Sequence, residues 1–341
     1  MSRNRLNISV VILLIIVAIL LFVMNLFVGS VNIPFRDLFD VVFGDSSNST
    51  VRTIVYDYRL PQAVTAMLAG AALSVAGLLM QTLFRNPLAD PSMLGVSSGS
   101  GLGVAITILF TGVLGKEALS SFGLLSNIGV SLAAFIGAIL VLMLILGFSS
   151  RVRNMTTLII IGLMISYLSG SLTDILKFFS MKEDIHAFVI WGLGTFSAVG
   201  TSKIIFFSIC IIVGLFVSLF LSKNLNILLL GDLYAENLGL NIRRNNIIII
   251  LVSGYLTAIV TAYCGPIAFL GLAIPHLTRF IFRSSDHRIL IPATMLIGMI
   301  VSMFCNLIAR MPGFEGNLPI NAVTAFIGAP IVIWVIFKKN N

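Results

Sequence analysis

Residues 8–28 have the sequence ISVVILLIIVAILLFVMNLFV, which contains no charged side chain. An α-helix rises 1.5 Å per residue, so about 20 apolar residues span the hydrocarbon core of a bilayer. Arg3 and Arg5 precede this stretch, as basic residues precede the core of a signal peptide. The apolar part is longer than the roughly 7–15 residues of such a core, and no small-x-small cleavage site follows. We therefore expect a retained first transmembrane helix.

Nine further apolar runs of similar kind follow along the chain. The seventh and eighth of the ten runs are separated only by Gly265-Pro266, and Pro275 lies inside the eighth, which predicts a kinked or broken helix there. Nine or eleven spans are the alternatives. The sequence thus predicts an all-α membrane protein with about ten transmembrane helices, the last nine at residues 61–84, 93–113, 122–148, 156–178, 201–221, 247–264, 267–282, 289–309 and 321–337.

The composition also indicates a membrane protein. Of the 341 residues, 58% are hydrophobic and only 10% are charged, whereas soluble domains carry about 25% charged residues. No polar stretch is long enough to form a separate soluble domain, so we expect residues 1–341 to form a single membrane domain. The three cysteines lie far apart within apolar runs and have no metal-ligand spacing, which predicts neither a disulfide nor a metal site. We expect no cofactor.

The distribution of charge predicts the orientation. Lysine and arginine are enriched on the cytoplasmic side of membrane proteins. If ten spans begin with the N-terminus inside, the inner segments hold more basic than acidic residues and the outer segments do not. We expect both termini in the cytoplasm. The inner basic residues are then Arg3, Arg5, Arg85, Arg151, Arg153, Lys223, Arg243, Arg244, Arg279, Arg283, Arg288, Lys338 and Lys339, and the outer ones Arg36, Arg52, Arg59, Lys116, Lys177, Lys182, Lys203 and Arg310.

The longest inner loop, within residues 223–246, contains a candidate short helix. Asp232 is a favourable N-cap residue and Gly239 a favourable residue just beyond a C-terminus. A helix of fewer than two turns is unstable alone, so it must pack on something. Two alternatives remain open at this point: it packs on its own protein, or it docks into a cytoplasmic motor subunit.

The sequence offers no catalytic site. There is no serine–histidine–acid set, and His276 and His287 are not spaced as convergent metal ligands. The glycine-rich segment at residues 95–103 lies in a membrane span, so close helix packing explains it better than phosphate binding. No G-x-x-x-x-G-K-[ST] motif is present. We predict a transport subunit and not an enzyme, with any ATP hydrolysis in a separate chain.

The fifth run contains ionisable residues near its outer end. Asp174 and Lys177 are three residues apart, so they can pair with each other on a helix. Placing an ionisable side chain in lipid costs free energy, so we expect both residues to face protein or an aqueous cavity. Mutual pairing and a position in the wall of a transport pathway are both consistent with this spacing. Met164, Tyr167 and Ser171 are further wall candidates by helical spacing.

Several motifs together resemble one family of bacterial permeases. The chain is similar to the permeases that import iron–siderophores, haem and vitamin B12, of the FecCD/BtuC type, over nearly its whole length. The blocks fall in the order found in that family. They are Tyr58-Arg59-Leu60-Pro61, Arg85-Asn86-Pro87-Leu88-Ala89-Asp90-Pro91, Leu94-Gly95-Val96-Ser97-Ser98-Gly99, Gly231-Asp232 with Leu238-Gly239, Gly265-Pro266-Ile267-Ala268-Phe269-Leu270-Gly271, and Gly328-Ala329-Pro330.

The resemblance implies an ATP-binding-cassette importer with two permeases, a cytoplasmic ATPase dimer and an external substrate-binding protein. It implies that the short inner helix is the coupling helix on the ATPase, with Asp232, Ala235, Glu236, Leu238 and Gly239 as its residues. It also implies a pathway at the permease dimer interface, lined by the fifth span, with an inner gate near Met155 and Thr156. The permease dimer can be homo- or heteromeric.

The same resemblance implies that outward arginines receive acidic residues of the binding protein. By position these are Arg59 and Arg310. Gln62 occupies a position that is often a second arginine in the family, and Asn317 one that is usually acidic, so Arg52 is a possible substitute. We expect import of iron–siderophore or haem-type chelates across the bacterial cytoplasmic membrane by alternating access. The alternatives are vitamin B12 import and, from another class, an ion-coupled carrier acting alone.

Overall fold

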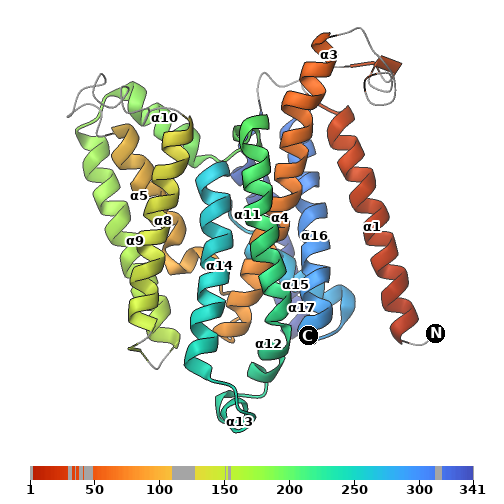
Figure 1. Cartoon of the computed structure of the whole chain (residues 1–341), viewed down its shortest axis with the longest axis vertical. Helices are drawn as coiled ribbons and strands as arrows, with labels where there is room; N and C mark the ends of the chain where they lie inside the picture. The colour runs from red at the N-terminus through yellow and green to blue at the C-terminus, as the bar shows by residue number, and fades with distance from the viewer. Residues whose placement is uncertain are drawn as a thin grey trace.

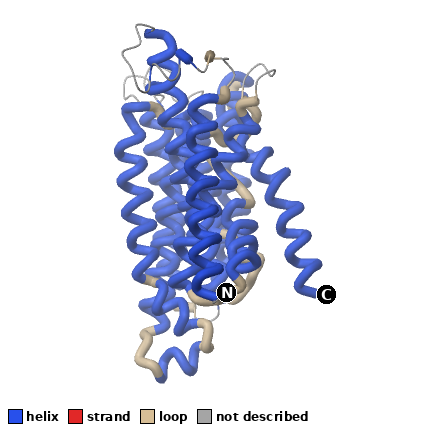
Figure 2. The backbone as a smooth tube through the Cα atoms, turned by 90° about the vertical axis from the view of Figure 1, so that its right-hand side faces the viewer, coloured by secondary structure: helices blue, strands red, loops and turns tan. Residues whose placement is uncertain are grey.

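The chain folds into a bundle of helices that run roughly along one direction (Figures 1 and 2). Within the part of the chain that the structure describes, every regular element is helical. The computed structural model describes residues 3–29, 33–34, 36–37, 41, 49–109, 127–149, 151–152, 155–311 and 317–340.

Each of the ten predicted apolar runs contains a helix, which confirms an all-α fold with about ten spans; residues 110–113 and 122–126 of the third and fourth runs lie outside the described residues. Seven are long and apolar enough to cross a membrane by length and composition, and α5, α15 and α17 are shorter apolar helices. The bounds are α1 Arg3–Phe27, α4 Leu60–Leu83, α5 Val96–Leu109, α8 Asn127–Ser149, α9 Met155–Phe178, α11 Thr201–Phe220, α14 Ile242–Cys264, α15 Leu270–Phe282, α16 His287–Ala309 and α17 Ile320–Asn340.

Shorter elements lie at the two ends of the bundle. The π-helical turn η1 joins α3 directly to α4, so residues 49–83 form one continuous helix. Helix α10 contains the aromatic segment at residues 188–191. The bounds are α3 Ser49–Thr53, η1 Ile54–Arg59, η2 Pro91–Leu94, α10 Lys182–Gly192, η3 Phe196–Ala198, α12 Ser222–Leu228 and α13 Asp232–Asn237.

Helix α4 lies at the centre and contacts α11, α14, α15 and α16. Small residues allow this close packing. A Cβ atom built on Gly70 would lie 2.3 Å from the Gly298 carbonyl oxygen, and one on Gly77 only 1.8 Å from that of Gly271. Ser74 lies on the same stripe, next to Gly298. Backbones can approach this closely only where side chains are missing.

The glycine-rich segment of α5 packs against α8. A Cβ atom on Gly99 would meet the Gly137 carbonyl oxygen at 2.6 Å, and one on Gly103 would meet that of Ala133 at 2.2 Å. Gly101, on the other side of the helix, has open space around it. The predicted packing role of this segment is therefore confirmed.

The seventh and eighth spans are separated by a short non-helical segment. Helix α14 ends at Cys264, and Gly265 and Phe269 both have left-handed backbone conformations, with φ values of +75° and +69°. The Asn321 side-chain oxygen accepts a hydrogen bond from the Ala268 N–H at 3.0 Å. Pro275 lies inside α15, so the interruption falls before α15 and not at the proline.

The outer surface of the bundle is apolar. Large aliphatic and aromatic side chains are exposed along α1, α8, α9 and α11, as expected where lipid is the solvent. The start of α1 and the end of α17 both lie toward the end of the bundle from which α13 projects (Figures 1 and 2). Helices α3 and α10 mark the opposite end (Figure 1).

Candidate functional site

Helix α13 projects beyond the bundle as the tip of one end (Figure 1). The Gly239 N–H donates to the Glu236 carbonyl at 2.8 Å, and the Leu240 N–H donates to the Ala235 carbonyl at 3.0 Å. Gly239 has φ +84°. This pattern is a Schellman motif, in which a left-handed residue, usually glycine, ends the helix. The predicted short helix and its glycine terminus are thus present.

The N-terminus of α13 differs from the prediction. Gly231, with φ +101°, occupies the N-cap position, and Asp232 is the first helical residue. The Asp232 carboxylate does not cap the helix and instead pairs with the Arg85 guanidinium. The second arginine contact, from Arg85 Nη2 to the Leu228 carbonyl, is 3.4 Å long. Arg85 therefore ties the α4–η2 loop to the start of α13.

Helix α13 buries little and exposes much apolar surface. Ala235 is fully buried, whereas Leu233, Tyr234 and Leu238 are 79%, 69% and 62% exposed. The charged Glu236 is exposed between them. Apolar side chains on a helix that lies beyond the membrane-spanning part are typical of a surface that binds another protein.

A polar cluster connects this tip to the bundle. The Asn226 side-chain oxygen on α12 accepts hydrogen bonds from the His287 N–H and ring Nδ1, each at 2.8 Å. The Asn226 amide group donates to the Asp286 carboxylate at 2.6 Å. The Arg288 N–H and Asn226 hold the pKa of Asp286 below its usual range by hydrogen bonding. The His287 ring also contacts Thr82 of α4 at 2.8 Å. Helix α12 is therefore fixed to α16 and α4.

Helix α9 presents two different faces. Leu158, Gly162, Ser169 and Thr173 are buried, and a Cβ atom on Gly162 would lie 2.3 Å from the Met93 carbonyl oxygen. This face packs on η2 and α5.

The opposite face of α9 carries the predicted pathway residues. Met164, Tyr167, Ser171 and Asp174 are all exposed, and their spacing puts them on one side of the helix. At the N-terminal end of α9, Thr156 is exposed and Met155 is half-buried. The face thus mixes polar and apolar side chains over a helix about 36 Å long.

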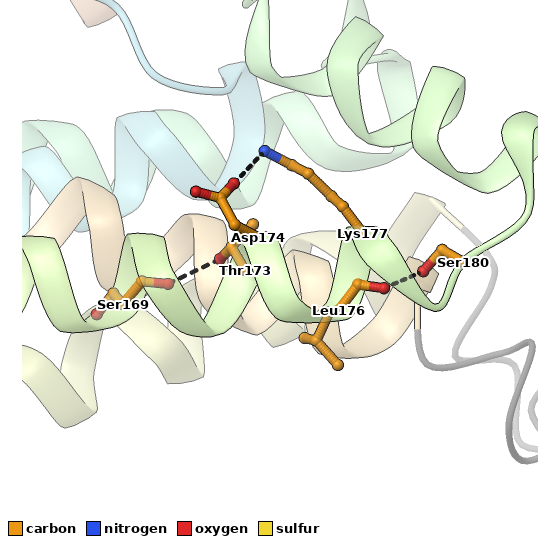
Figure 3. Close-up of polar contacts among 6 residues, drawn as sticks. All are labelled: Ser169, Thr173, Asp174, Leu176, Lys177 and Ser180. Atoms are coloured by element: carbon orange, nitrogen blue, oxygen red, sulfur yellow. Dashed lines mark hydrogen bonds and ion pairs between the residues drawn. The ribbon is translucent and has the colours of Figure 1, made fainter.

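Asp174 and Lys177 form the predicted ion pair, 3.1 Å long, near the C-terminal end of α9. Figure 3 shows the two side chains meeting on one side of the helix, while Leu176 points to the other side. The Lys177 ammonium also lies 5.2 Å from the ring centre of Phe188 on α10. The Asp174 side chain remains mostly exposed, so pairing leaves the carboxylate accessible on the exposed face of α9.

The two arginines that the family resemblance assigns to docking of a binding protein lie in a buried environment, which the sequence did not predict. Arg59 and Arg310 are only 2% and 5% exposed. Arg59 Nη1 donates to the carbonyls of Leu26 and Phe27, at 2.9 and 2.7 Å, and Arg310 Nη1 donates to that of Asn25 at 3.3 Å. Both cations thus bind the C-terminal carbonyls of α1, where a positive charge is favourable.

Both arginines also line a polar cavity of about 300 Å³ at the α10 end of the bundle, together with Asp57, Gln62 and Asn317. Burial, and the charge of Arg59 beside it, lower the pKa of Arg310 to about 10, so this group stays cationic at neutral pH. Arg52, by contrast, is exposed on α3.

Several buried polar contacts between helices were not predicted from the sequence. A chain of amide hydrogen bonds crosses from Gln62 to Asn306 at 3.0 Å and from Asn306 to Asn25 at 2.7 Å, joining α4, α16 and α1. Asn226 of α12 likewise lies in a stretch where the sequence shows no motif and where we expected a loop. A single asparagine inside an apolar run, such as Asn25 or Asn306, is the signal in the sequence that indicates such a contact. A buried amide group needs a hydrogen-bond partner.

A bundle of apolar helices with a lipid-compatible outer surface, a mixed face on one long helix and a projecting helix at one end defines a polytopic membrane permease. The sequence profile of the FecCD transport family matches residues 14–338. The chain belongs to this family and is an importer permease of the ATP-binding-cassette class.

Relatives and a solved structure agree with this assignment. The chain is 32% identical over 297 residues to the vitamin B12 import system permease protein BtuC of Klebsiella pneumoniae, covering 87% of this chain and 86% of the relative. It is 33% identical over 309 residues to an ABC transporter permease protein of Methanocaldococcus jannaschii, covering 86% of each. A metal-chelate type ABC transporter, solved in an inward-facing conformation, superposes with a TM-score of 0.84 at 28% identity, covering 97% of this chain and 99% of that chain.

Proposed function

We propose that this permease subunit moves iron–siderophore or haem-type iron chelates into the cell by alternating access. Two permeases, which can be identical or different, form the pathway between their α9 helices. A separate ATPase dimer docks on α13 in the cytoplasm, and an external binding protein delivers the substrate at the α10 end. Both termini are cytoplasmic. This arrangement leaves no role for an ion-coupled carrier acting alone.

The apolar tip of α13 is the observation that carries the proposal. Leu233, Tyr234 and Leu238 are exposed although this helix lies beyond the bundle. Ala235 anchors the helix from within, and Asp232 pairs with Arg85. A motor subunit that binds here would cover the exposed Leu233, Tyr234 and Leu238 side chains. Removing this apolar surface from water favours binding.

The α9 face supports the pathway. A bulky chelate carries both polar and apolar surface, and the series Met164, Tyr167, Ser171 and Asp174 offers both. Met155 and Thr156 lie at the end of α9 nearest α13 and are proposed as the inner gate. Movement of α13 would reach this face through the packed helices of the bundle.

Docking of the binding protein is proposed at the polar cavity beside Arg59 and Arg310. Because both guanidinium groups already bind carbonyls of α1, an incoming carboxylate has to share them. Exposed Arg52 offers a further contact. Such charges mainly guide the approach and orientation of the partner.

The substrate class is tested by transport. The chain is reconstituted in vesicles with its own ATPase and binding protein, and ATP-dependent uptake is measured for a ferric siderophore, haem and vitamin B12. We expect uptake of an iron chelate. Vitamin B12, which the name of the BtuC relative supports, is the second candidate. Uptake of vitamin B12 alone would contradict the iron assignment but leave the importer mechanism intact.

The role of α13 is tested separately. We expect L233D/L238D to abolish ATPase binding and ATP-driven uptake, because charged side chains would replace the apolar contact. The matched control L233M/L238M keeps the apolar surface and should retain both. Thermal unfolding should be unchanged in either variant, since both side chains are exposed. Normal ATPase binding by L233D/L238D would refute this docking site.

A further inference from the structure

The segment at residues 84–95, which leads from α4 through η2, touches both the projecting helix α13 and the candidate pathway helix α9. These two helices lie apart: in Figure 1, α13 projects at the lower end of the bundle and α9 lies at its left side. Helix α13 contacts α12 and α14, whereas α9 contacts α5, α8 and η2. A movement of α13 therefore needs an intermediate element to reach α9.

Arg85 makes the contact at the α13 end of this segment. Its guanidinium group pairs with the Asp232 carboxylate in the first turn of α13 and donates to the carbonyl of Leu228, the last residue of α12, at 3.4 Å. Both side chains of the ion pair are exposed, and exposed ion pairs contribute little to stability. The pair therefore fixes the position of α13 more than it stabilises the fold.

The backbone at Arg85 supports a specific role for this residue. Arg85 has φ +48°, in the left-handed region that non-glycine residues rarely occupy. It lies just beyond the C-terminus of α4, a position where glycine is the usual residue. An arginine that is held in this strained conformation indicates a function for its side chain.

The middle of the segment is rigid. Pro87 and Pro91 restrict the backbone, and the Asn86 side-chain oxygen accepts a hydrogen bond from the Leu88 N–H at 2.9 Å. The Pro87 carbonyl accepts a hydrogen bond from the His276 ring at 2.6 Å, which holds the segment against α15. A displacement at one end of such a segment is therefore passed to the other end.

At its far end, the backbone of the segment lies directly on the backbone of α9. A Cβ atom on Gly162 would lie 2.3 Å from the Met93 carbonyl oxygen, and one on Gly95 would lie 3.0 Å from the Gly162 carbonyl oxygen. Because no side chain separates the two backbones here, side-chain rotation cannot absorb a shift of η2. The candidate pathway residues Met164 and Tyr167 lie on the opposite, exposed face of the same part of α9.

We propose that Arg85 is a positioning residue for transport, which makes residues 84–95 pass the movement of α13 to α9 through its pair with Asp232. The proposal rests on the proposed function, in which an ATPase binds α13 and α9 lines the pathway. Arg85 acts through the position of η2 and not by contact with the substrate. Without the pair, the exposed Leu233 and Leu238 still bind the ATPase, but the movement of α13 reaches α9 less completely.

Coupled transport by the full complex tests this role. The chain is reconstituted with its ATPase and binding protein, and ATPase affinity, ATP hydrolysis and substrate uptake are measured for R85Q, D232N, R85K and the exchange R85D/D232R. The control R243Q removes an exposed arginine at the start of α14, which lies at the same end of the bundle.

We expect R85Q and D232N to lower uptake per ATP about fivefold while ATPase affinity changes less than about twofold, because the pair couples two sites and does not form the docking surface. R85K keeps the charge and should retain most of the ratio. R85D/D232R restores an ion pair and should recover part of the ratio. R243Q should behave like the wild type.

A labelled cysteine on α9 gives a second readout. The three native cysteines are replaced by alanine, and Leu168→Cys, at an exposed position of α9, carries a fluorophore that responds to its surroundings. ATP should change the fluorescence of the complex, and R85Q should remove most of this change. A merely structural role of Arg85 would not affect this response while the ATPase stays bound.

Two results would overturn the proposal. Wild-type uptake per ATP in R85Q, with an unchanged fluorescence response, would show that α13 acts on α9 by another route. Loss of ATPase binding by R85Q would show that the pair supports the docking surface itself. Failure of the proposed function looks different, because the wild-type complex would then show no ATP-driven uptake, and the role of Arg85 would fall with it.

Discussion

At the scale of single residues, Gly77 is the described glycine at which an added Cβ atom would come nearest to another backbone, 1.8 Å from the Gly271 carbonyl oxygen. Its missing side chain lets α4 contact the Gly271 backbone of α15 directly. Because the obstacle is backbone and not a flexible side chain, the helices would have to move apart to accept a methyl group. Overpacking of this kind costs about 1–3 kcal/mol.

We therefore predict that Gly77→Ala lowers the thermal unfolding temperature of the purified chain. The control is Gly101→Ala on α5, where nothing lies within 4 Å of the added methyl group. That substitution should be neutral or stabilise by about 0.5–1 kcal/mol, since alanine favours a helix more than glycine does. Equal unfolding temperatures for the two variants would argue against the α4–α15 contact.

Arg59 and Arg310 show what sequence can and cannot predict at this scale. Successive spans cross the membrane in alternate directions, so the positions of both arginines in the chain predicted the end of the bundle at which they lie. Their burial was not predicted, because it depends on α1 crossing beside them and presenting its last carbonyls. The π-helical turn η1 also shifts the register of the residues before α4. No pattern in the sequence predicts this turn.

At the scale of elements, α12 is the connection between the projecting helix and the bundle. Asn226 joins it to the first turn of α16 through the Asp286 side chain and the His287 backbone and ring. Thr82 extends the contact to α4. Asn226 therefore offers one route, beside the Arg85–Asp232 pair, by which a movement of α13 would be passed to two central helices.

We predict that Asn226→Ala weakens the link between ATP hydrolysis and uptake while α13 still binds the ATPase. Coupling between sites is typically worth about 1–3 kcal/mol, so uptake per ATP should fall about fivefold or more. Lys223→Ala, an exposed change on the same helix, is the matched control. Unchanged uptake per ATP in Asn226→Ala would exclude this route.

The positions of the long elements were largely predictable, because each needs an apolar run of membrane length. Details at their ends were not. The break between α14 and α15 depends on hydrogen bonds from distant segments, such as Asn321 to the Ala268 N–H and Thr195 to the Cys264 carbonyl. The pairing of Arg85 with Asp232 likewise joins residues far apart in the sequence.

At the scale of the whole molecule, the two ends of the bundle have different chemistry. One end carries the exposed apolar tip of α13 and the start of α1, and the other carries the polar cavity with Arg59 and Arg310. The candidate pathway on α9 runs between them. Each proposed partner binds at one particular end, so the proposals depend on which end faces the cytoplasm.

Labelling of single thiols in intact cells tests this orientation most directly. The native Cys210, Cys264 and Cys305 are replaced by alanine, and one cysteine is introduced at Glu236 or at Met311, both of which are exposed. Met311 directly follows the buried Arg310, so an exposed cysteine there reports on the end of the bundle that carries the arginines. With a membrane-impermeant maleimide, we predict that position 311 reacts in intact cells and position 236 only after lysis. Reaction at position 236 from outside, with position 311 protected until lysis, would contradict the account.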